Sequence, residues 1–236
     1  MRSAIKSASY PNRESLAEAA ARLLVEKIAL CTAEEGRCLV ALSGGSTPAA
    51  TYRLLAGAGL DWGAVHIVQT DERVTGVRSE TSAAVIEDNL VRPARIPASR
   101  WHPMPGITGD DLARSAADYA RTLGGLGGDG TPDIVLLGLG EDGHTASLFE
   151  GDTAAETAER VAVTMPYQGT VRLTLGAGLL AGARTRIVLA AGKAKAQAVS
   201  RLLNGDVPAG DPAARILGED GMLFVDHEAL AYSEAL

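Results

Sequence analysis

The sequence IVLLGLGEDGHTASLF, residues 134–149, decides the fold and carries the strongest chemical signal in the chain. Its apolar start, Ile134 to Leu137, predicts a buried parallel strand. Three glycines follow within six positions, and they let the backbone turn sharply and approach a ligand closely. Asp142 and His144 therefore emerge together at the carboxyl end of a strand, where open α/β sheets bind their ligands. An imidazole exchanges protons near neutral pH, and a neighbouring carboxylate can fix its tautomer.

Residues 138–143 also match the dinucleotide-binding pattern G-x-G-x-x-G, which gives an alternative interpretation. That pattern requires an acidic residue roughly 20 positions later, at the end of the next strand, to bind the ribose. The next strand-like run, Arg160 to Met165, ends instead in Pro166 and Tyr167. A histidine directly after the third glycine also suits a reactive site better than a pyrophosphate turn. We therefore favour a reactive site at His144 over a nicotinamide site.

Composition and charge restrict the class of protein. The chain has 236 residues, of which 46% are apolar and 22% charged, and this fits one large α/β domain spanning residues 1–236. Its net charge of −7 means that a phosphate-bearing partner must be met by local cations. The sequence contains no basic stripe and no interleaving of basic and aromatic residues, so we expect no nucleic-acid partner.

Cysteine usage and hydropathy indicate the cellular setting. The two cysteines, Cys31 and Cys38, lack metal-type spacing and are typical of small core residues in a reducing cytoplasm. No apolar run approaches the roughly 18 residues that a membrane helix requires. Charged residues at positions 13, 14 and 18 interrupt any signal-peptide core. The sequence therefore predicts a soluble, cytoplasmic protein with no membrane partner and no bound metal.

A second informative stretch follows the short apolar strand Cys38 to Leu42. It consists of Ser43, Gly44, Gly45, Ser46, Thr47 and Pro48. The glycines open the backbone, Ser46 or Thr47 can cap a helix, and a proline suits the first helical turn. A strand, a glycine turn and a helix N-terminus together present free N–H groups and a positive dipole end, which favour an anion. The loop lacks the lysine of a Walker A motif, and an ordinary well-capped turn is the alternative.

Two further predicted strands place charged residues at their carboxyl ends. The strand Val65 to Thr70 is followed by Asp71, Glu72 and Arg73. The strand Arg186 to Ala190 is followed by Gly192 to Lys195 and a helix. A cation at a helix N-terminus is mildly disfavoured unless an anion joins it. A solvated loop and a solvated surface lysine are the alternatives.

The carboxyl ends of parallel strands share one edge of a doubly wound sheet. Polar or charged residues follow four predicted strands at this edge, and these strands end near Leu42, Thr70, Leu137 and Ala190. We therefore expect residues 43–47, Arg73, His144 and Lys195 to converge.

The remaining segments alternate between helices and strands. Apolar spacing predicts helices from Asn12 to about Glu35, about Thr81 to Val91, Asp110 to Leu123 and Asp226 onward. Strands are predicted at Val161 to Thr164, Val171 to Leu175 and Met222 to Val225. The proline-rich segment from Arg95 to Gly106 is expected to be a surface connection.

Together these motifs resemble the 6-phosphogluconolactonase family. The likeness covers nearly the whole chain, in matching order, at Leu42–Pro48, Asp71–Arg73, Gly138–Phe149, Arg172–Leu175 and Gly192–Lys195. The segment DGHTASLF is the most specific of these motifs. The sister family, glucosamine-6-phosphate deaminase, is similar in the glycine loop and in Asp-Gly-His, but it continues differently after the histidine.

The resemblance implies a Rossmann-like three-layer α/β/α sandwich with a mainly parallel central sheet, like that of the glucosamine-6-phosphate deaminase and ribose-5-phosphate isomerase group. It implies hydrolysis of 6-phospho-D-glucono-1,5-lactone to 6-phospho-D-gluconate in the pentose phosphate pathway. By position, His144 would be the general base that activates water. Arg73 and Lys195 would bind the phosphate together with the loop 43–47, and Arg172 is a further candidate.

Lactone hydrolysis requires water to be deprotonated, an oxyanion to be stabilised and the ring oxygen to be protonated as it leaves. A neutral imidazole can perform the first and last steps, and backbone N–H groups of the glycine-rich loops can stabilise the oxyanion. Either Asp142 or Asp71 could orient His144. No metal or cofactor is expected. The alternatives are a deaminase/isomerase with a carboxylate base at Asp71, and a non-catalytic sugar-phosphate-binding domain. In each case we expect a monomer or a weak homodimer.

Four departures from the family pattern border the expected substrate opening. Thr70 stands where the family usually has Gly, Ser82 and its neighbours replace a Ser-Asn pair, and Glu150 replaces a Pro. The proline-rich segment before Arg172 is reduced to residues 165–170. These changes are expected to affect the substrate and the turnover more than the fold.

Overall fold

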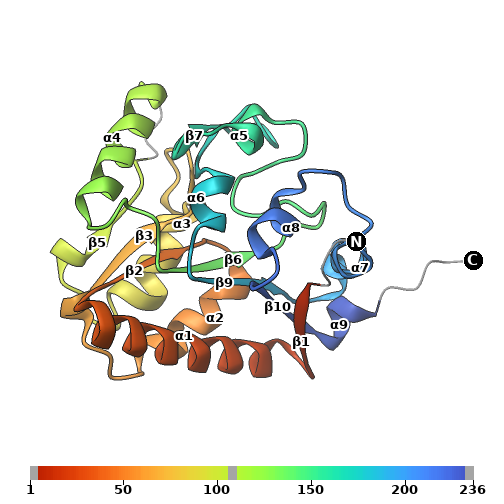
Figure 1. Ribbon diagram of the computed structural model, residues 1–236, viewed down its shortest axis with the longest axis horizontal. Helices are drawn as coiled ribbons and strands as arrows, with labels where there is room; N and C mark the ends of the chain where they lie inside the picture. The colour runs from red at the N-terminus through yellow and green to blue at the C-terminus, as the bar shows by residue number, and fades with distance from the viewer. Residues whose placement is uncertain (1–4, 106–110, 232–236) are drawn as a thin grey trace, which may run out of the picture.

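The computed structural model describes residues 5–105 and 111–231, and these residues are built around one parallel sheet (Figure 1). Its strands follow the order β1–β10–β9–β6–β2–β3–β5, and every pairing between them is parallel. Their bounds are Lys6–Tyr10 for β1, Met222–Asp226 for β10, Thr185–Ala190 for β9, Ile134–Gly138 for β6, Cys38–Leu42 for β2, Val65–Gln69 for β3 and Trp101–His102 for β5. Parallel pairing requires long crossover connections, and most of these contain helices.

Helices cover both faces of this sheet (Figure 1). One face carries α1 (Arg13–Glu35), α2 (Ser46–Ala56) and α3 (Ser82–Ile86), and α3 continues as a π-helical turn over Glu87–Val91. The other face carries α4 (Leu112–Gly125), α5 (Thr153–Glu156), α6 (Ala177–Ala181), α7 (Ala196–Asn204) and α8 (Pro212–Leu217), and α9 (His227–Leu230) packs beside α7. The three-layer α/β/α sandwich predicted from the sequence is confirmed. None of the described helices has both the length and the apolar composition needed to cross a membrane.

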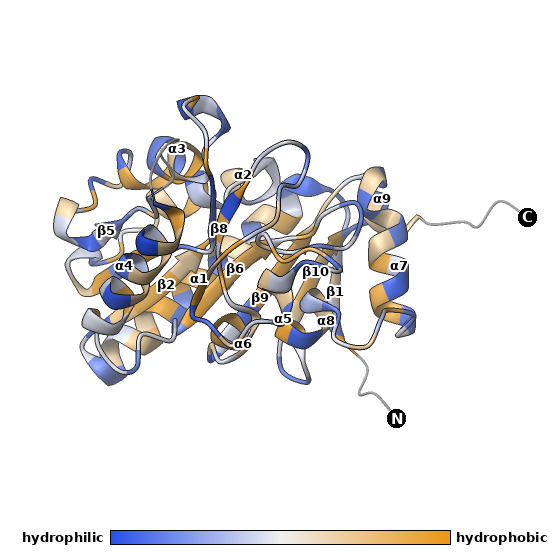
Figure 2. Ribbon diagram, turned by 90° about the horizontal axis from the view of Figure 1, so that it is seen from above, coloured by the Kyte–Doolittle hydropathy of each residue, from blue (hydrophilic) through white to orange (hydrophobic). Residues whose placement is uncertain are grey.

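The central strands are continuously apolar because both of their faces are buried. Along β2, Leu39 and Ala41 pack into the hydrophobic cluster between the sheet and the helices α4 and α7. Val40 and Leu42 pack into the cluster on the other face, between the sheet and the helices α1 and α2. Successive side chains of a strand point to opposite faces, so one unbroken apolar run serves both clusters. The hydropathy colouring shows these strands as predominantly apolar, while the surrounding helices mix polar and apolar residues (Figure 2).

A small second sheet excludes the alternative of a solvated loop after β3. Its antiparallel strands are β4 (Asp71–Arg73), β8 (Arg172–Leu175) and β7 (Val161–Val163). Within β4, Asp71 is 7% and Glu72 2% exposed. The Glu72 carboxylate accepts the N–H groups of Ser82 and Ala83 at 2.8 Å each, which satisfies the free donors at the start of α3. The charged run is therefore part of the framework of the fold.

Long elements follow their predicted bounds within a few residues, whereas several short elements and both edge strands of the main sheet are missed. The sequence patterns do not predict β1, α5, α6 or α8, and β5 lies inside the segment expected to be a surface connection. Between positions 81 and 91 the expected helix is α3 followed by the π-helical turn. Of the predicted segments, Gly106, Asp110 and residues 232–236 lie outside the described residues.

The direction of the chain through the sheet reverses between β2 and β6. From β2 the chain runs outward through β3 to β5, and it then returns to the other side of β2 to form β6, from which β9 and β10 follow. Where two adjacent strands lead away in opposite directions, a crevice opens beyond their carboxyl ends, and open α/β sheets bind ligands there. The Ser43 N–H donates to the Leu136 carbonyl at 3.1 Å and joins the two strands at this edge.

Candidate active site

A cavity of about 960 Å³ opens at this reversal point. Its walls come from the loops after β2 and β6 and from the strands β4 and β8. Residues of α2 and α3 and the residue before α7 complete the lining. It is lined by every residue that the sequence analysis names as catalytic or phosphate-binding, namely Ser43, Gly44, Gly45, Ser46, Thr47, Asp71, Arg73, Asp142, His144, Arg172 and Lys195. The fold thus brings residues from five separate segments together at one site.

His144 and Asp142 form a hydrogen-bonded pair on the loop after β6. His144 Nδ1 lies 2.5 Å from Asp142 Oδ1, and the same oxygen accepts the His144 backbone N–H at 3.1 Å. Burial acts to raise the pKa of Asp142, but the His144 imidazole and hydrogen bonds from His144 and Tyr167 outweigh burial, so this pKa is lowered. An ionised carboxylate can only accept hydrogen bonds. Nδ1 therefore carries a proton, and in the neutral imidazole Nε2 has a free lone pair.

Gly140 makes room for this pair. A Cβ atom at Gly140 would overlap His144 Nδ1 and Asp142 Oδ1. Because no side chain is present, the imidazole lies directly against the backbone at the end of β6, and the Gly140 N–H donates to the His144 carbonyl at 2.7 Å. The Phe149 ring packs against the imidazole with 4.7 Å between ring centroids. These contacts fit a role in holding His144 better than they fit dinucleotide binding.

Asp71 occupies a different part of the cavity wall. Its carboxylate accepts the hydroxyl groups of Thr70 at 2.8 Å and Ser147 at 2.7 Å. Thr70, which stands where the resembled family usually has Gly, also lies 2.8 Å from the Ser43 hydroxyl. Among the described residues, Asp71 makes no hydrogen bond to His144. Of the two carboxylates that the sequence leaves open, the geometry therefore favours Asp142 as the one that orients His144.

The loop after β2 ends at the N-terminus of α2, but its capping differs from the expectation. Capping by Ser46 or Thr47 is wrong, because α2 begins at Ser46 and Gly45 occupies the N-cap with φ of 102°. No side chain caps this helix within the described residues, so its first N–H groups face the cavity without a side-chain partner. The helix N-terminus therefore keeps the free donors and the positive dipole end that favour an anion.

Close packing fixes the position of this loop. A Cβ atom at Gly44 would overlap the backbone and side chain of Ser82 at the start of α3. The Tyr52 hydroxyl donates to the Ser43 carbonyl at 2.5 Å from the interior of α2. The loop is therefore held from both α2 and α3, and its backbone lines the cavity.

Two arginines face each other across the small sheet beside the cavity. Arg73 of β4 and Arg172 of β8 are direct partners in the antiparallel register, and like charges in such positions destabilise a sheet. Arg172 is 6% exposed, and burial together with Arg73 lowers the pKa of its guanidinium. Its Nε has no hydrogen-bond partner among the described residues. A bound anion would relieve both the repulsion and the unsatisfied donor.

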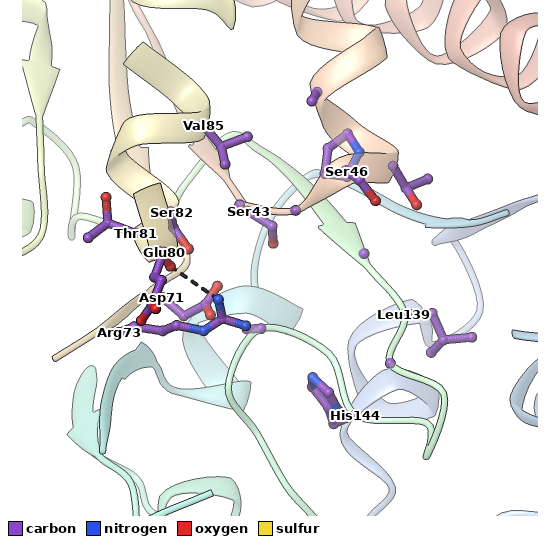
Figure 3. Close-up of a pocket in the computed structure, with 18 of the residues that line it drawn as sticks. Ser43, Ser46, Asp71, Arg73, Glu80, Thr81, Ser82, Val85, Leu139 and His144 are labelled. Carbon is purple, nitrogen blue, oxygen red and sulfur yellow. Dashed lines mark hydrogen bonds between the residues drawn. The ribbon is translucent and has the colours of Figure 1, made fainter. Parts of the chain in front are cut away.

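Arg73 and Lys195 enter the cavity from two different elements, β4 and the turn before α7. The Arg73 side chain extends into the cavity between the sides that carry Ser43 and His144, and its Nη1 donates to the Glu80 carbonyl at 3.1 Å (Figure 3). Lys195 precedes the first residue of α7, where a cation is disfavoured. Burial lowers the pKa of Lys195, and Glu141 and Asp142 partly oppose this effect. A bound phosphate would therefore stabilise both charges. It would reduce the repulsion between Arg73 and Arg172 and would offset the burial of Lys195.

Comparison with known proteins places the chain in a family. The sequence profile of the glucosamine-6-phosphate isomerases/6-phosphogluconolactonase family matches residues 11–225. The chain belongs to this family. The resemblance drawn from the sequence motifs is therefore confirmed.

Relatives and solved structures of this family are similar along almost their full length. A 6-phosphogluconolactonase of Synechocystis sp. is 32% identical over 222 residues, which cover 90% of this chain and 91% of that protein. The solved 6-phosphogluconolactonase of Trypanosoma brucei is 28% identical and superimposes with a TM-score of 0.82 over 95% of this chain and 97% of that one. A monomeric glucosamine-6-phosphate deaminase, 24% identical over 96% and 99% of the two chains, shares the fold with a TM-score of 0.84.

Three side chains contact the predicted site residues but are not among the residues that the sequence analysis names. The Tyr167 hydroxyl donates to Asp142 Oδ2 at 2.8 Å, and Arg201 of α7 donates to the Asp142 carbonyl at 2.6 Å. Ser147 bridges Asp71 and Arg172, with Arg172 Nη1 at 3.5 Å from its hydroxyl. Ser147 lies within the most specific motif and could have been selected on that ground. Nothing in the local sequence around Tyr167 or Arg201 indicates a contact with Asp142.

A separate cluster combines residue types that can bind metals. Single donor atoms of Cys31, Cys38 and Asp133 lie within 4.8 Å of one another, although their spacing in the sequence has no metal-binding pattern. Cys38 starts β2, so the cluster lies at the opposite end of that strand from the cavity. Burial raises the pKa of both thiols, and Asp133 already accepts the Leu39 N–H at 2.7 Å. Metal binding would require two thiols that burial keeps protonated to be ionised.

Proposed function

We propose that the protein hydrolyses 6-phospho-D-glucono-1,5-lactone to 6-phospho-D-gluconate, a step of the pentose phosphate pathway. The observation that carries this proposal is the position of the His144–Asp142 pair in the same cavity as Arg73, Arg172 and Lys195. The pair supplies a proton acceptor near neutral pH, and the cations supply a phosphate site in a chain whose net charge is −7. Membership of the family supports the same reaction.

In the proposed mechanism His144 acts first as a base and then as an acid. Nε2 takes a proton from water as the water oxygen attacks the lactone carbonyl, and Asp142 stabilises the resulting imidazolium through Nδ1. The tetrahedral intermediate then collapses with cleavage of the bond between the carbonyl carbon and the ring oxygen. The imidazolium returns its proton to that oxygen, which becomes the hydroxyl of the open acid. Backbone N–H groups of the glycine-rich loops stabilise the oxyanion.

The substrate phosphate is proposed to lie at the N-terminus of α2, between Arg73 and Lys195. The uncapped N–H groups of that helix and the loop 43–47 would donate to the phosphate oxygens. The guanidinium groups of Arg73 and Arg172 would form charge-assisted hydrogen bonds with it, and the phosphate would neutralise their mutual repulsion. Binding energy from the phosphate then places the lactone carbonyl near His144.

A coupled assay on two substrates tests the reaction itself. Freshly prepared 6-phosphogluconolactone is supplied, and release of 6-phosphogluconate is measured against the spontaneous hydrolysis at the same pH. Glucosamine 6-phosphate is supplied in parallel, because the alternative activity would use Asp71 as a base on carbon. We expect acceleration on the lactone alone. Ammonia release from glucosamine 6-phosphate, without acceleration on the lactone, would replace the proposed function with the deaminase reaction.

We further propose that residues 1–236 act as one domain, as a monomer or weak homodimer in the cytoplasm, without a nucleic-acid partner. All proposed groups come from a single copy of the chain, so the mechanism does not need a second subunit. Sedimentation velocity over a range of protein concentrations, combined with the lactone assay, measures whether activity depends on association.

A further inference from the structure

Tyr167 is held next to the catalytic pair by a tight hairpin turn. The turn connects β7 to β8, and the N–H and carbonyl groups of Tyr167 and Thr170 pair with each other at 3.0 and 3.1 Å. The two central residues, Gln168 and Gly169, have φ values of 51° and 78°, as a type I′ turn requires. This shortened segment, which departs from the resembled family pattern, is therefore an ordered support for the tyrosine ring.

The Tyr167 side chain contacts both members of the catalytic pair. Its hydroxyl donates to Asp142 Oδ2 at 2.8 Å, and its ring meets the His144 ring edge-on with 5.6 Å between centroids. The ring also stacks on Phe149 at 3.9 Å with an interplanar angle of 13°, and the Arg172 guanidinium lies 5.5 Å from its centroid. The hydrogen bond to Asp142 is the main cause of the raised pKa of Tyr167, so the hydroxyl stays protonated and remains a donor.

This contact completes the hydrogen bonding of an exposed carboxylate. The Asp142 side chain is 45% exposed, and its Oδ1 already serves His144. A terminal carboxylate rotates readily, because its last torsion has a broad energy profile. With only Oδ1 engaged, the carboxylate could exchange its oxygens and turn toward water. A second hydrogen bond on Oδ2 fixes the plane of the carboxylate and, through it, the plane of the imidazole.

We propose that Tyr167 is a positioning residue for the His144–Asp142 pair. Its hydroxyl holds the Asp142 carboxylate in the orientation that keeps Nδ1 of His144 protonated and leaves Nε2 free to accept a proton from water. The inference rests on the proposed lactone hydrolysis for its kinetic consequence. The tautomer of His144, by contrast, is a property of the free protein and can be measured without turnover.

Tyr167→Phe is the sharpest variant, because it removes the hydroxyl and keeps the ring on Phe149 and Arg172. We expect kcat on the phosphorylated lactone to fall about tenfold, as the loss of one hydrogen bond to a charged group predicts, while KM changes little. Imidazole ¹⁵N signals of His144 should report a protonated Nδ1 in the wild type and a mixture of tautomers in the variant. Tyr10→Phe, which alters a tyrosine on β1 packed against Phe224, is the matched control.

A double-variant cycle separates positioning from a general structural effect. If Tyr167 acts through Asp142, Tyr167→Phe should cause little further loss of kcat in an Asp142→Asn background. Multiplied losses, a wild-type kcat with a wild-type tautomer, or a raised KM with unchanged kcat would each overturn the inference. A wild-type protein without lactonase activity would reject the proposed function instead, and the ¹⁵N signals would still test the Tyr167 contact.

Discussion

The loops after β2 and β6 both use a glycine to make room for a neighbouring side chain, but they differ in the functional groups that they carry. They leave neighbouring strands at the reversal point of the sheet. In each loop one glycine lies where a side chain from another position needs the space, Ser82 against Gly44 and His144 against Gly140. The loop after β2 bears only hydroxyl side chains and an uncapped helix N-terminus. The loop after β6 bears a carboxylate and an imidazole in contact.

In the proposed function this difference assigns phosphate binding to the loop after β2 and proton transfer to the loop after β6. A backbone anion site has no group of its own that titrates near neutral pH, so pH changes phosphate binding there only through the phosphate and the neighbouring side chains. In the proposed mechanism the loop after β6 instead supplies one group that must gain and lose a proton during each turnover. If the division is correct, substitutions near the first loop raise KM, and substitutions in the second lower kcat.

The largest expected effect belongs to the second loop. His144→Asn removes the proton acceptor and keeps a side chain of similar size, so kcat should fall by roughly 10²–10⁴-fold, the usual contribution of general acid–base catalysis. KM and the affinity for 6-phosphogluconate should change little. In the wild type, kcat/KM should fall on the acid side as an imidazole becomes protonated. The coupled assay, corrected for spontaneous hydrolysis at each pH, measures both.

His227→Asn is the matched control, because His227 is an exposed residue at the start of α9 and does not line the cavity. It should leave the rate and the pH profile unchanged. A folded His144→Asn protein with near wild-type turnover would falsify the role of His144 and direct attention to Asp71, the other carboxylate of the cavity wall.

Local patterns in the sequence account for the two loops. The apolar runs of β2 and β6, the glycines after them and the change from strand to helix spacing all lie within short stretches, so each loop and its place at the sheet edge could be predicted. The convergence of Arg73, His144 and Lys195 then follows from the parallel topology. The roles of these residues remain proposals that the variants test.

Contacts between distant segments could not be predicted in this way. The pairing of β4 with β8 places Arg73 opposite Arg172, and residues 71–73 alone carry no signal for it. The choice between Asp71 and Asp142 likewise depends on Ser147 and Thr70, whose hydroxyls donate hydrogen bonds to the Asp71 carboxylate. Tyr167 reaches Asp142 only because an antiparallel hairpin returns beside the glycine loop. Side-chain geometry across the two sheets decides each case.

A smaller effect, on binding alone, is expected at the first loop's side of the cavity. Arg73→Ala should raise KM for the phosphorylated lactone about 10- to 100-fold, which corresponds to the loss of a charge-assisted hydrogen bond worth about 1.5–3 kcal/mol. Its kcat should change little. Unphosphorylated gluconolactone should be nearly unaffected, because that substrate has no charge to lose. Steady-state kinetics on both lactones measure the contrast.

Arg78→Ala provides the control for Arg73. Arg78 carries the same charge on the same connection, but it pairs with Glu87 and Asp88 and does not line the cavity. It should leave both substrates unchanged. Equal losses on the two lactones in Arg73→Ala would indicate that the arginine supports the small sheet, and the proposed division between the loops would then fail at this residue.

The smallest expected effect is at Lys195, and it depends on pH. Burial lowers the pKa of this lysine, so its charge is lost at a lower pH than the charge of an exposed lysine. Lys195→Ala should weaken 6-phosphogluconate binding a few-fold at neutral pH, on the scale of about 1 kcal/mol expected for a partly exposed ion pair. Wild-type binding should weaken toward alkaline pH for the same reason, and the difference between wild type and variant should shrink there.

Lys195→Arg separates charge from geometry in this last case. A guanidinium stays protonated at all accessible pH values, so this variant should bind 6-phosphogluconate at neutral pH and lose the alkaline weakening. Product binding is the correct readout, because lactones hydrolyse spontaneously and the background rate would distort KM at high pH. Lys193→Ala, at an exposed neighbouring lysine outside the cavity lining, is the control. If alkaline weakening persists in Lys195→Arg, the group whose titration weakens binding is another residue of the cavity, and the proposed role of Lys195 in the pH dependence is wrong.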